Sequence, residues 1–120
     1  MQYVAGVCNI GRKNRLRRTV IGAAFVVSSI FIYYFISSNG LDRTFVLMLF
    51  PVFSIGFLNI IESIKEFCVL NGLNGTYNMD SGEVEVASFA ERAKDKMRAF
   101  EILLVAVAMA AVSAGIMYFI

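Results

Sequence analysis

Three stretches of this chain are long, apolar and free of charged residues. They cover residues 19–36, 44–61 and 102–120. At a rise of about 1.5 Å per residue the first would be about 27 Å long as a helix, close to the roughly 30 Å hydrocarbon core of a bilayer. The pattern predicts three transmembrane helices. Membrane helices tolerate proline, and we expect Pro51 to kink the second.

The polar segment after the second stretch contains the turn signals. We expect the second helix to continue to about residue 70 and to stop at Asn71-Gly72, a pair typical of helix C-termini. Residues 71–86 then read as a loop. A small hairpin that turns at Asp80-Ser81-Gly82 is the alternative, because residues 84–86 alternate weakly between apolar and polar.

The third helix is predicted to begin well before its apolar stretch. Ser88 and Glu91 have the spacing of a capping box. Apolar residues then recur at steps of three and four, namely Val86, Ala90, Ala93, Met97 and Phe100. Charges occupy the other face, with Glu91–Lys94 and Asp95–Arg98 as expected ion pairs. We therefore expect one helix over 87–120 whose apolar stripe packs on the chain's own loop or docks a partner.

Composition supports a lipid environment for the whole chain. It is 58% hydrophobic, with a mean hydropathy of +0.70. A soluble domain of this size could not bury so much apolar surface. The expected fold is an all-α membrane protein with three transmembrane helices, the third extended by a cytoplasmic amphipathic helix. Residues 1–120 form a single domain.

The distribution of basic residues predicts the orientation. Ten of the eleven Lys and Arg residues precede the first span or lie between the second and third, and only Arg43 lies in the other turn. The positive-inside rule then places the N-terminus in the cytoplasm and the C-terminus outside. A cluster next to the first span is expected to set topology and to contact lipid headgroups: Arg12, Lys13, Arg15, Arg17 and Arg18. It lacks a stacking platform for nucleic acid, so no nucleic-acid partner is expected.

The candidate chemistry is sparse. The chain has no histidine, two cysteines, and no nucleotide-binding or nucleophile motif. We therefore expect no enzymatic activity, no cofactor and no metal site built by one chain. No span has an ionisable residue at its centre, which disfavours a transporter.

Cys8 and Cys68 are the candidate thiol pair. Both are expected on the cytoplasmic side of the hairpin of the first two spans. They could act as a redox pair, or two chains could combine four thiolates around a metal. The other interpretation is a pair of reduced, unreactive thiols, as is usual in the cytosol.

Small residues predict where helices approach one another. Ala106, Ala110 and Ala114 repeat every four residues in the third span, and Ala111 and Gly115 follow an adjacent line. Gly22 is the corresponding small residue in the first span. Such residues let helix backbones pack closely, either within one chain or between chains.

Part of the chain resembles a known family of small membrane domains. The resembling residues are Asn9-Ile10-Gly11, Arg15, Arg18 and Gly22, then Phe67-Cys68, Leu70 and Gly72. Over residues 8–75 the chain is similar to the YgaP-type inner-membrane domain, which occurs alone or attached to membrane-bound rhodaneses. The resemblance implies a two-helix hairpin that anchors and self-associates. The usual Cys-Pro reads Cys68-Val69 here, a third span is added, and there is no rhodanese domain.

The leading hypothesis is a small non-enzymatic membrane protein that acts by helix packing. Its partners would be membrane lipids and either further copies of itself, as a homo-oligomer, or other subunits of a larger membrane complex. A membrane-bound thiol protein that uses Cys8 and Cys68 is one alternative. A helical subunit of a filament or viral envelope is another.

Overall fold

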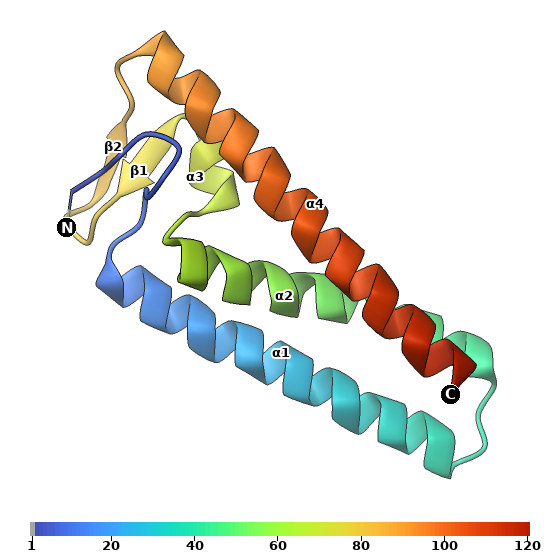
Figure 1. Cartoon of the computed structure of the whole chain (residues 1–120). Coiled ribbons are helices and arrows are strands. Elements are labelled where there is room, and N and C mark those ends of the chain that lie inside the picture. The colour runs from blue at the N-terminus through green and yellow to red at the C-terminus, as the bar shows by residue number, and fades with distance from the viewer. Residues whose placement is uncertain (1) are drawn as a thin grey trace.

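Three long helices dominate the computed structural model, which describes residues 2–120 (Figure 1). They are α1 (Arg12–Ser38), α2 (Leu49–Lys65) and α4 (Phe89–Phe119), and a 3-10 helix, η1 (Arg43–Met48), leads directly into α2. Helix α1, the continuous segment of η1 and α2 (Arg43–Lys65), and α4 are each long and apolar enough to cross a membrane. The predicted helical fold with three candidate spans is confirmed, and the chain is a small multi-pass membrane protein.

The helices form a thin layer in which α2 lies between α1 and α4 (Figure 1). The described chain measures 54 × 24 × 16 Å. At one end, here called the basic end, α1 and α4 begin and α2 stops. There α1 and α4 diverge, and the space between them is occupied by α3 (Val69–Asn74), the strands β1 (Thr76–Asn78) and β2 (Glu83–Glu85), and residues 2–11.

Two glycines let α1 and α2 approach closely. A Cβ atom on Gly22 would lie 2.8 Å from the backbone oxygen of Gly56 and 2.7 Å from Cγ1 of Ile60. A Cβ on Gly56 would lie 2.9 Å from Cγ2 of Val26. The predicted packing role of Gly22 therefore has a partner, Gly56, that the sequence reading did not single out.

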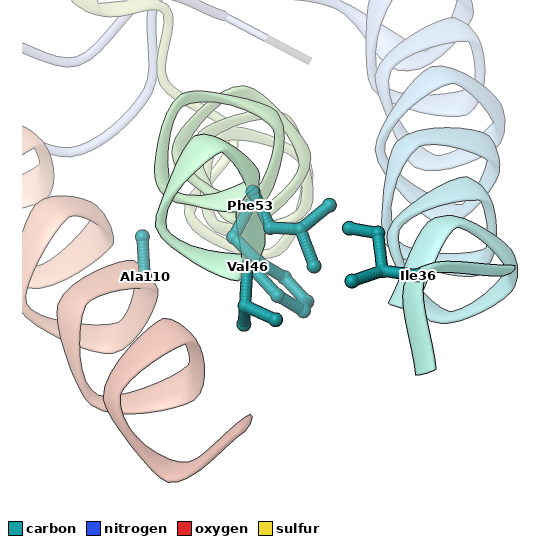
Figure 2. Packing of buried hydrophobic residues seen from close by; sticks show 5 residues of the cluster. Ile36, Val46, Phe53 and Ala110 are labelled. Carbon is teal, nitrogen blue, oxygen red and sulfur yellow. The ribbon is translucent and has the colours of Figure 1, made fainter. Parts of the chain in front are cut away.

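At the opposite end, apolar side chains from all three long helices meet. Figure 2 shows Val46 of η1 and Phe53 of α2 between Ile36 of α1 and Ala110 of α4. Pro51 lies in the first turn of α2, just after the change from 3-10 to α geometry. A proline without its N–H is tolerated in a first turn.

The predicted continuation of the second helix to residue 70 is wrong. Helix α2 ends at Lys65 because Glu66 adopts a left-handed conformation with φ of 56°. The following backbone is held by a side chain of α2 and by residue 9: the Glu62 carboxylate accepts from the N–H of Val69 at 2.8 Å, and the Asn9 side-chain oxygen accepts from the N–H of Cys68 at 2.6 Å. Tertiary hydrogen bonds replace the helical ones, and a separate short helix, α3, begins at Val69.

The segment predicted as a loop over 71–86 is more ordered than a loop. Its first residues complete α3, and β1 and β2 then form an antiparallel hairpin in which Tyr77 pairs with Val84. The turn contains Asp80 and Gly82, both with positive φ. The hairpin alternative is confirmed. Residues 9–11 extend it, since the N–H of Gly11 donates to the carbonyl of Asn78 at 2.9 Å.

Helix α4 begins as predicted but turns a different face inward. The Ser88 hydroxyl accepts from the N–H of Glu91, so the N-terminal cap is confirmed. However, Met97 and Phe100 of the predicted stripe are 68% and 54% exposed, whereas Asp95 and Ala99 are fully buried. Of the two expectations for the stripe, packing on the chain's own loop is therefore wrong for Met97 and Phe100, and docking of a partner stays a prediction.

The predicted ion pair of Asp95 with Arg98 is also wrong. Asp95 points into the protein, where its carboxylate accepts from the backbone N–H of Gly6 at 2.7 Å. Arg98 instead pairs with Glu101 at 3.0 Å.

Candidate functional site

The candidate thiols lie at the basic end, in a cluster of buried polar groups that joins residues 8–9, α1 and the end of α2. Asn9 links the two cysteine segments. Its side-chain oxygen accepts from the N–H of Cys68 at 2.6 Å, and its amide nitrogen donates to the Cys68 carbonyl at 3.1 Å. Asn9 thus satisfies both backbone groups of Cys68, and the sequence neighbour of Cys8 is brought directly onto Cys68.

Arg18 of α1 bridges the cluster from the other side. One guanidinium nitrogen pairs with the Glu62 carboxylate at 3.0 Å, and another donates to Sγ of Cys68 at 3.1 Å. The Glu62 side chain is only 5% exposed and that of Arg18 is 22% exposed. A buried carboxylate needs this pairing, because an uncompensated charge in such a place is costly.

A second, more exposed pair lies beside it. Arg15 pairs with Glu66 at 2.8 Å and donates from Nε to the Ser63 carbonyl at 3.0 Å. Arg15 therefore binds two of the residues where α2 ends. Together the two arginines fix the end of α2 against α1.

These contacts divide the predicted headgroup residues into two groups. Arg15 and Arg18 are used inside the chain, whereas Arg12, Lys13 and Arg17 are exposed. The carboxylate of Asp80 lies against the start of α1 and accepts from the backbone N–H of Lys13 at 3.3 Å. An acidic group at a helix N-terminus is favourable because of the helix dipole.

The environment of the thiols is that of structural cysteines. Both cysteines are free and buried, and Sγ of Cys8 donates to the carbonyl of Gln2 at 3.2 Å. Burial raises the pKa of the Cys68 thiol, and the hydrogen bonds and Arg18 offset this only in part. A thiol held in its neutral form is a poor nucleophile and a poor metal ligand. Among residues 2–120, no three His, Cys, Asp or Glu side chains form a group that could hold a metal.

A second buried polar centre surrounds Asp95 on α4. Besides Gly6, it accepts a 2.5 Å hydrogen bond from the Tyr3 hydroxyl, and the Tyr3 ring stacks on Tyr77 of β1 at 4.3 Å between centroids. Burial and the neighbouring Asp95 carboxylate raise the pKa of Tyr3 above its ordinary value. Asp95 thereby fastens residues 3–6 to α4.

The predicted helix-packing residues of α4 also separate into two groups. Ala106, Ala110 and Ala114 are buried, on the same face as Ile102. Ala111 is exposed, and a Cβ on Gly115 would meet nothing within 4 Å. The three buried alanines therefore pack within the chain, whereas Ala111 and Gly115 face outward.

A groove of about 250 Å³ lies between α3 and the start of α4. Leu73, Arg92, Ala93 and Lys96 are among the residues that line it. Arg92 is already engaged, because its Nε donates to the Val86 carbonyl at 2.5 Å. The groove therefore offers one uncommitted basic side chain, that of Lys96.

Sequence reading identified the cysteines, the basic cluster and the small residues, but it missed the groups that join them. No sequence pattern singles out Glu62, and Asn9 enters only through the family resemblance. Asp95 was assigned to the solvent face. Comparisons with protein families, curated proteins and solved structures find no match. The family resemblance over residues 8–75 therefore stays a prediction.

Proposed function

We propose that this chain is a small non-enzymatic membrane protein that acts by helix packing, with further copies of itself or as an accessory subunit of a larger membrane complex. The observation that carries the proposal is how its polar side chains are used. Arg18, Glu62, Asn9 and Asp95 all make contacts that close the chain on itself. The exposed surface of the candidate spans is apolar, and on α4 exposed apolar side chains such as Met97 continue into the charged segment before the uncharged stretch.

The thiol alternative is weakened by the same contacts. Cys68 is enclosed by Asn9, Arg18 and the backbone of its own turn, and its thiol is kept neutral. A redox or metal-binding role would require the cluster to open. The filament or envelope alternative receives no support from any particular contact.

The direct test of the proposed function is purification in mild detergent followed by mass measurement of the intact assembly. The proposal expects either several copies of the chain or a fixed ratio with another membrane protein. A chain that is strictly monomeric in both detergent and bilayer discs, with no accompanying protein, would contradict it.

The proposed orientation places the basic end in the cytoplasm, because of the ten-to-one distribution of basic residues. Asn39→Cys at the opposite end should then be labelled in intact cells by an impermeant thiol reagent. Ser81→Cys in the exposed hairpin turn should be labelled only after lysis. The parent chain is the control, because Cys8 and Cys68 are buried. The reverse labelling pattern would overturn the orientation.

A further inference from the structure

Helix α4 carries a second apolar face, on the side away from its buried residues. Seven residues define this outer stripe, in alternating steps of three and four: Ala90, Ala93, Met97, Phe100, Leu104, Val107 and Ala111. All seven are exposed. Three heptads of this spacing are the pattern of a coiled-coil seam, in which such residues occupy the core positions.

The outer stripe crosses from the polar part of α4 into its apolar part without interruption. Lipid explains exposed apolar residues after about residue 102, where the uncharged stretch begins. It does not explain Met97 at 68% exposure in a segment that also contains Arg92, Lys94, Lys96 and Arg98. A helix covered by lipid alone needs no apolar stripe on its charged stalk.

The position of α4 in the fold leaves this face open. Helix α2 lies between α1 and α4, so α4 forms an edge of the layer (Figure 1). Asp95, Ala99 and Ile102 belong to the buried face of α4. Within residues 2–120, α3 borders the opposite side only at the groove that Ala93 and Lys96 line, and Met97 and Phe100 remain 68% and 54% exposed.

Two of the charged residues that flank the stripe have a self-complementary arrangement. Lys96 directly precedes Met97, and Glu101 directly follows Phe100; both are exposed, and Glu101 also pairs with Arg98 of its own helix at 3.0 Å. In heptad terms they occupy the g position and the following e position, five residues apart. A parallel two-fold pair of helices places these two positions opposite each other across the seam, where e and g charges select the partner. Lys96 of each copy would then face Glu101 of the other.

The geometry points to a second copy of this chain as the occupant of the outer stripe, in a parallel two-fold pair of α4 helices over residues 90–111. Two copies inserted by the same topology signals are necessarily parallel, which is the orientation that the charges require. The seam ends near Ala111, because the next position in the repeat, Ala114, is buried within the chain. An α-helix drifts by about 20° per heptad relative to a 3.5-residue repeat, so this divergence is expected.

This inference rests on the proposed function, and cysteine crosslinking in membrane vesicles tests it separately. Leu104→Cys lies on the outer stripe, and Val105→Cys is its matched control, one residue further along, half-exposed and at nearly the same depth. Oxidation should crosslink Leu104→Cys and Met97→Cys chains into dimers. It should leave Val105→Cys chains and the parent chain as monomers.

Charge exchange then identifies the partner as a second copy. Lys96→Glu and Glu101→Lys should each weaken dimerisation on the order of tenfold, because two attractive pairs become repulsive. A mixture of the two variants should recover dimers, since the introduced glutamate of one chain faces a lysine of the other. The double variant should also recover. Persistent weakness in the mixture would overturn the proposed register.

The outcomes distinguish this interface from the general proposal. Equal crosslinking at residues 104 and 105 overturns the interface but leaves an oligomeric membrane protein. An equimolar second protein without crosslinking at residue 104 likewise overturns the interface alone. A monomer in every membrane environment overturns both.

Discussion

The two ends of the molecule are held together in different ways. At the end where η1 meets α2, apolar side chains such as Ile36, Val46 and Phe53 fill the space between helices. At the basic end, α1 and α4 diverge, and Asn9, Glu62 and Asp95 make specific hydrogen bonds to backbone groups and side chains. Apolar packing tolerates many sequences of similar volume, whereas a buried polar network depends on each partner. Substitutions should therefore be least tolerated among the polar residues of the basic end.

The largest effect is expected at Glu62. Glu62→Ala should lower the free energy of unfolding by about 3 kcal/mol, because it leaves Arg18 unpaired in a largely buried position and removes the acceptor of the Val69 N–H. Unfolding of the purified protein by SDS titration from mild detergent measures this change.

Glu66→Ala is the control for that substitution. Its pair with Arg15 is partly exposed, with side chains 28% and 34% accessible, so its loss should cost about 0.5 kcal/mol. Equal losses for the two variants would show that burial does not decide the strength of these pairs.

The difference between the ends also decided what the sequence could predict. The three spans follow from uninterrupted apolar stretches, and the start of α4 follows from Ser88, whose cap is local. The position of Cys68, which Asn9 holds, and the burial of Asp95 depend on residues far away in the chain. Tyr3 and Gly6 bind Asp95 across about ninety positions, with separations of 92 and 89 residues, and no periodic pattern contains that information.

The charged part of α4 before residue 102 shows the limit of an interpretation based on hydrophobic periodicity alone. Asp95 and Ala99 face the interior in this segment, so Met97 and Phe100 face outward. Hydrophobic periodicity identified a real stripe, but it left open whether the stripe packs on the chain's own loop or docks a partner. The rule that apolar residues face the protein core holds only where no polar group inside the protein needs that face.

The second-largest effect is expected at Gly22, where α1 and α2 approach closely. Gly22→Ala should cost about 2 kcal/mol, because its Cβ would lie 2.8 Å from the backbone oxygen of Gly56, which cannot move without shifting α2. Gly115→Ala is the matched control, since its Cβ would meet nothing within 4 Å. The same unfolding titration compares the two. A larger loss for Gly22→Ala than for Glu62→Ala would contradict the expectation that the buried polar contacts tolerate substitution least.

The smallest effect concerns Cys68 and the pH dependence of stability. Burial raises the pKa of this thiol above its ordinary value of 9.0, so the folded chain holds the proton that the unfolded chain releases. The unfolded state therefore binds fewer protons as the pH rises through 9, and stability falls. The contribution of the protonated thiol to stability is fully present below the ordinary thiol pKa. Above that pKa it is lost, and the free energy of unfolding falls by at most about 1.4 kcal/mol per pH unit. Cys68→Ser should remove this loss.

Tyr3 complicates the comparison because its pKa is also raised, and it too destabilises the folded state at high pH. Both chains should therefore carry Tyr3→Phe, and unfolding should be measured from pH 7.5 to 10. We expect the chain with Cys68 to lose stability relative to the Cys68→Ser chain above about pH 9. The opposite result, a gain in stability with rising pH, would mean that Arg18 stabilises a thiolate more than burial disfavours it. Cys68 would then be an activated thiol, and the redox or metal-binding alternative would regain its chemical basis.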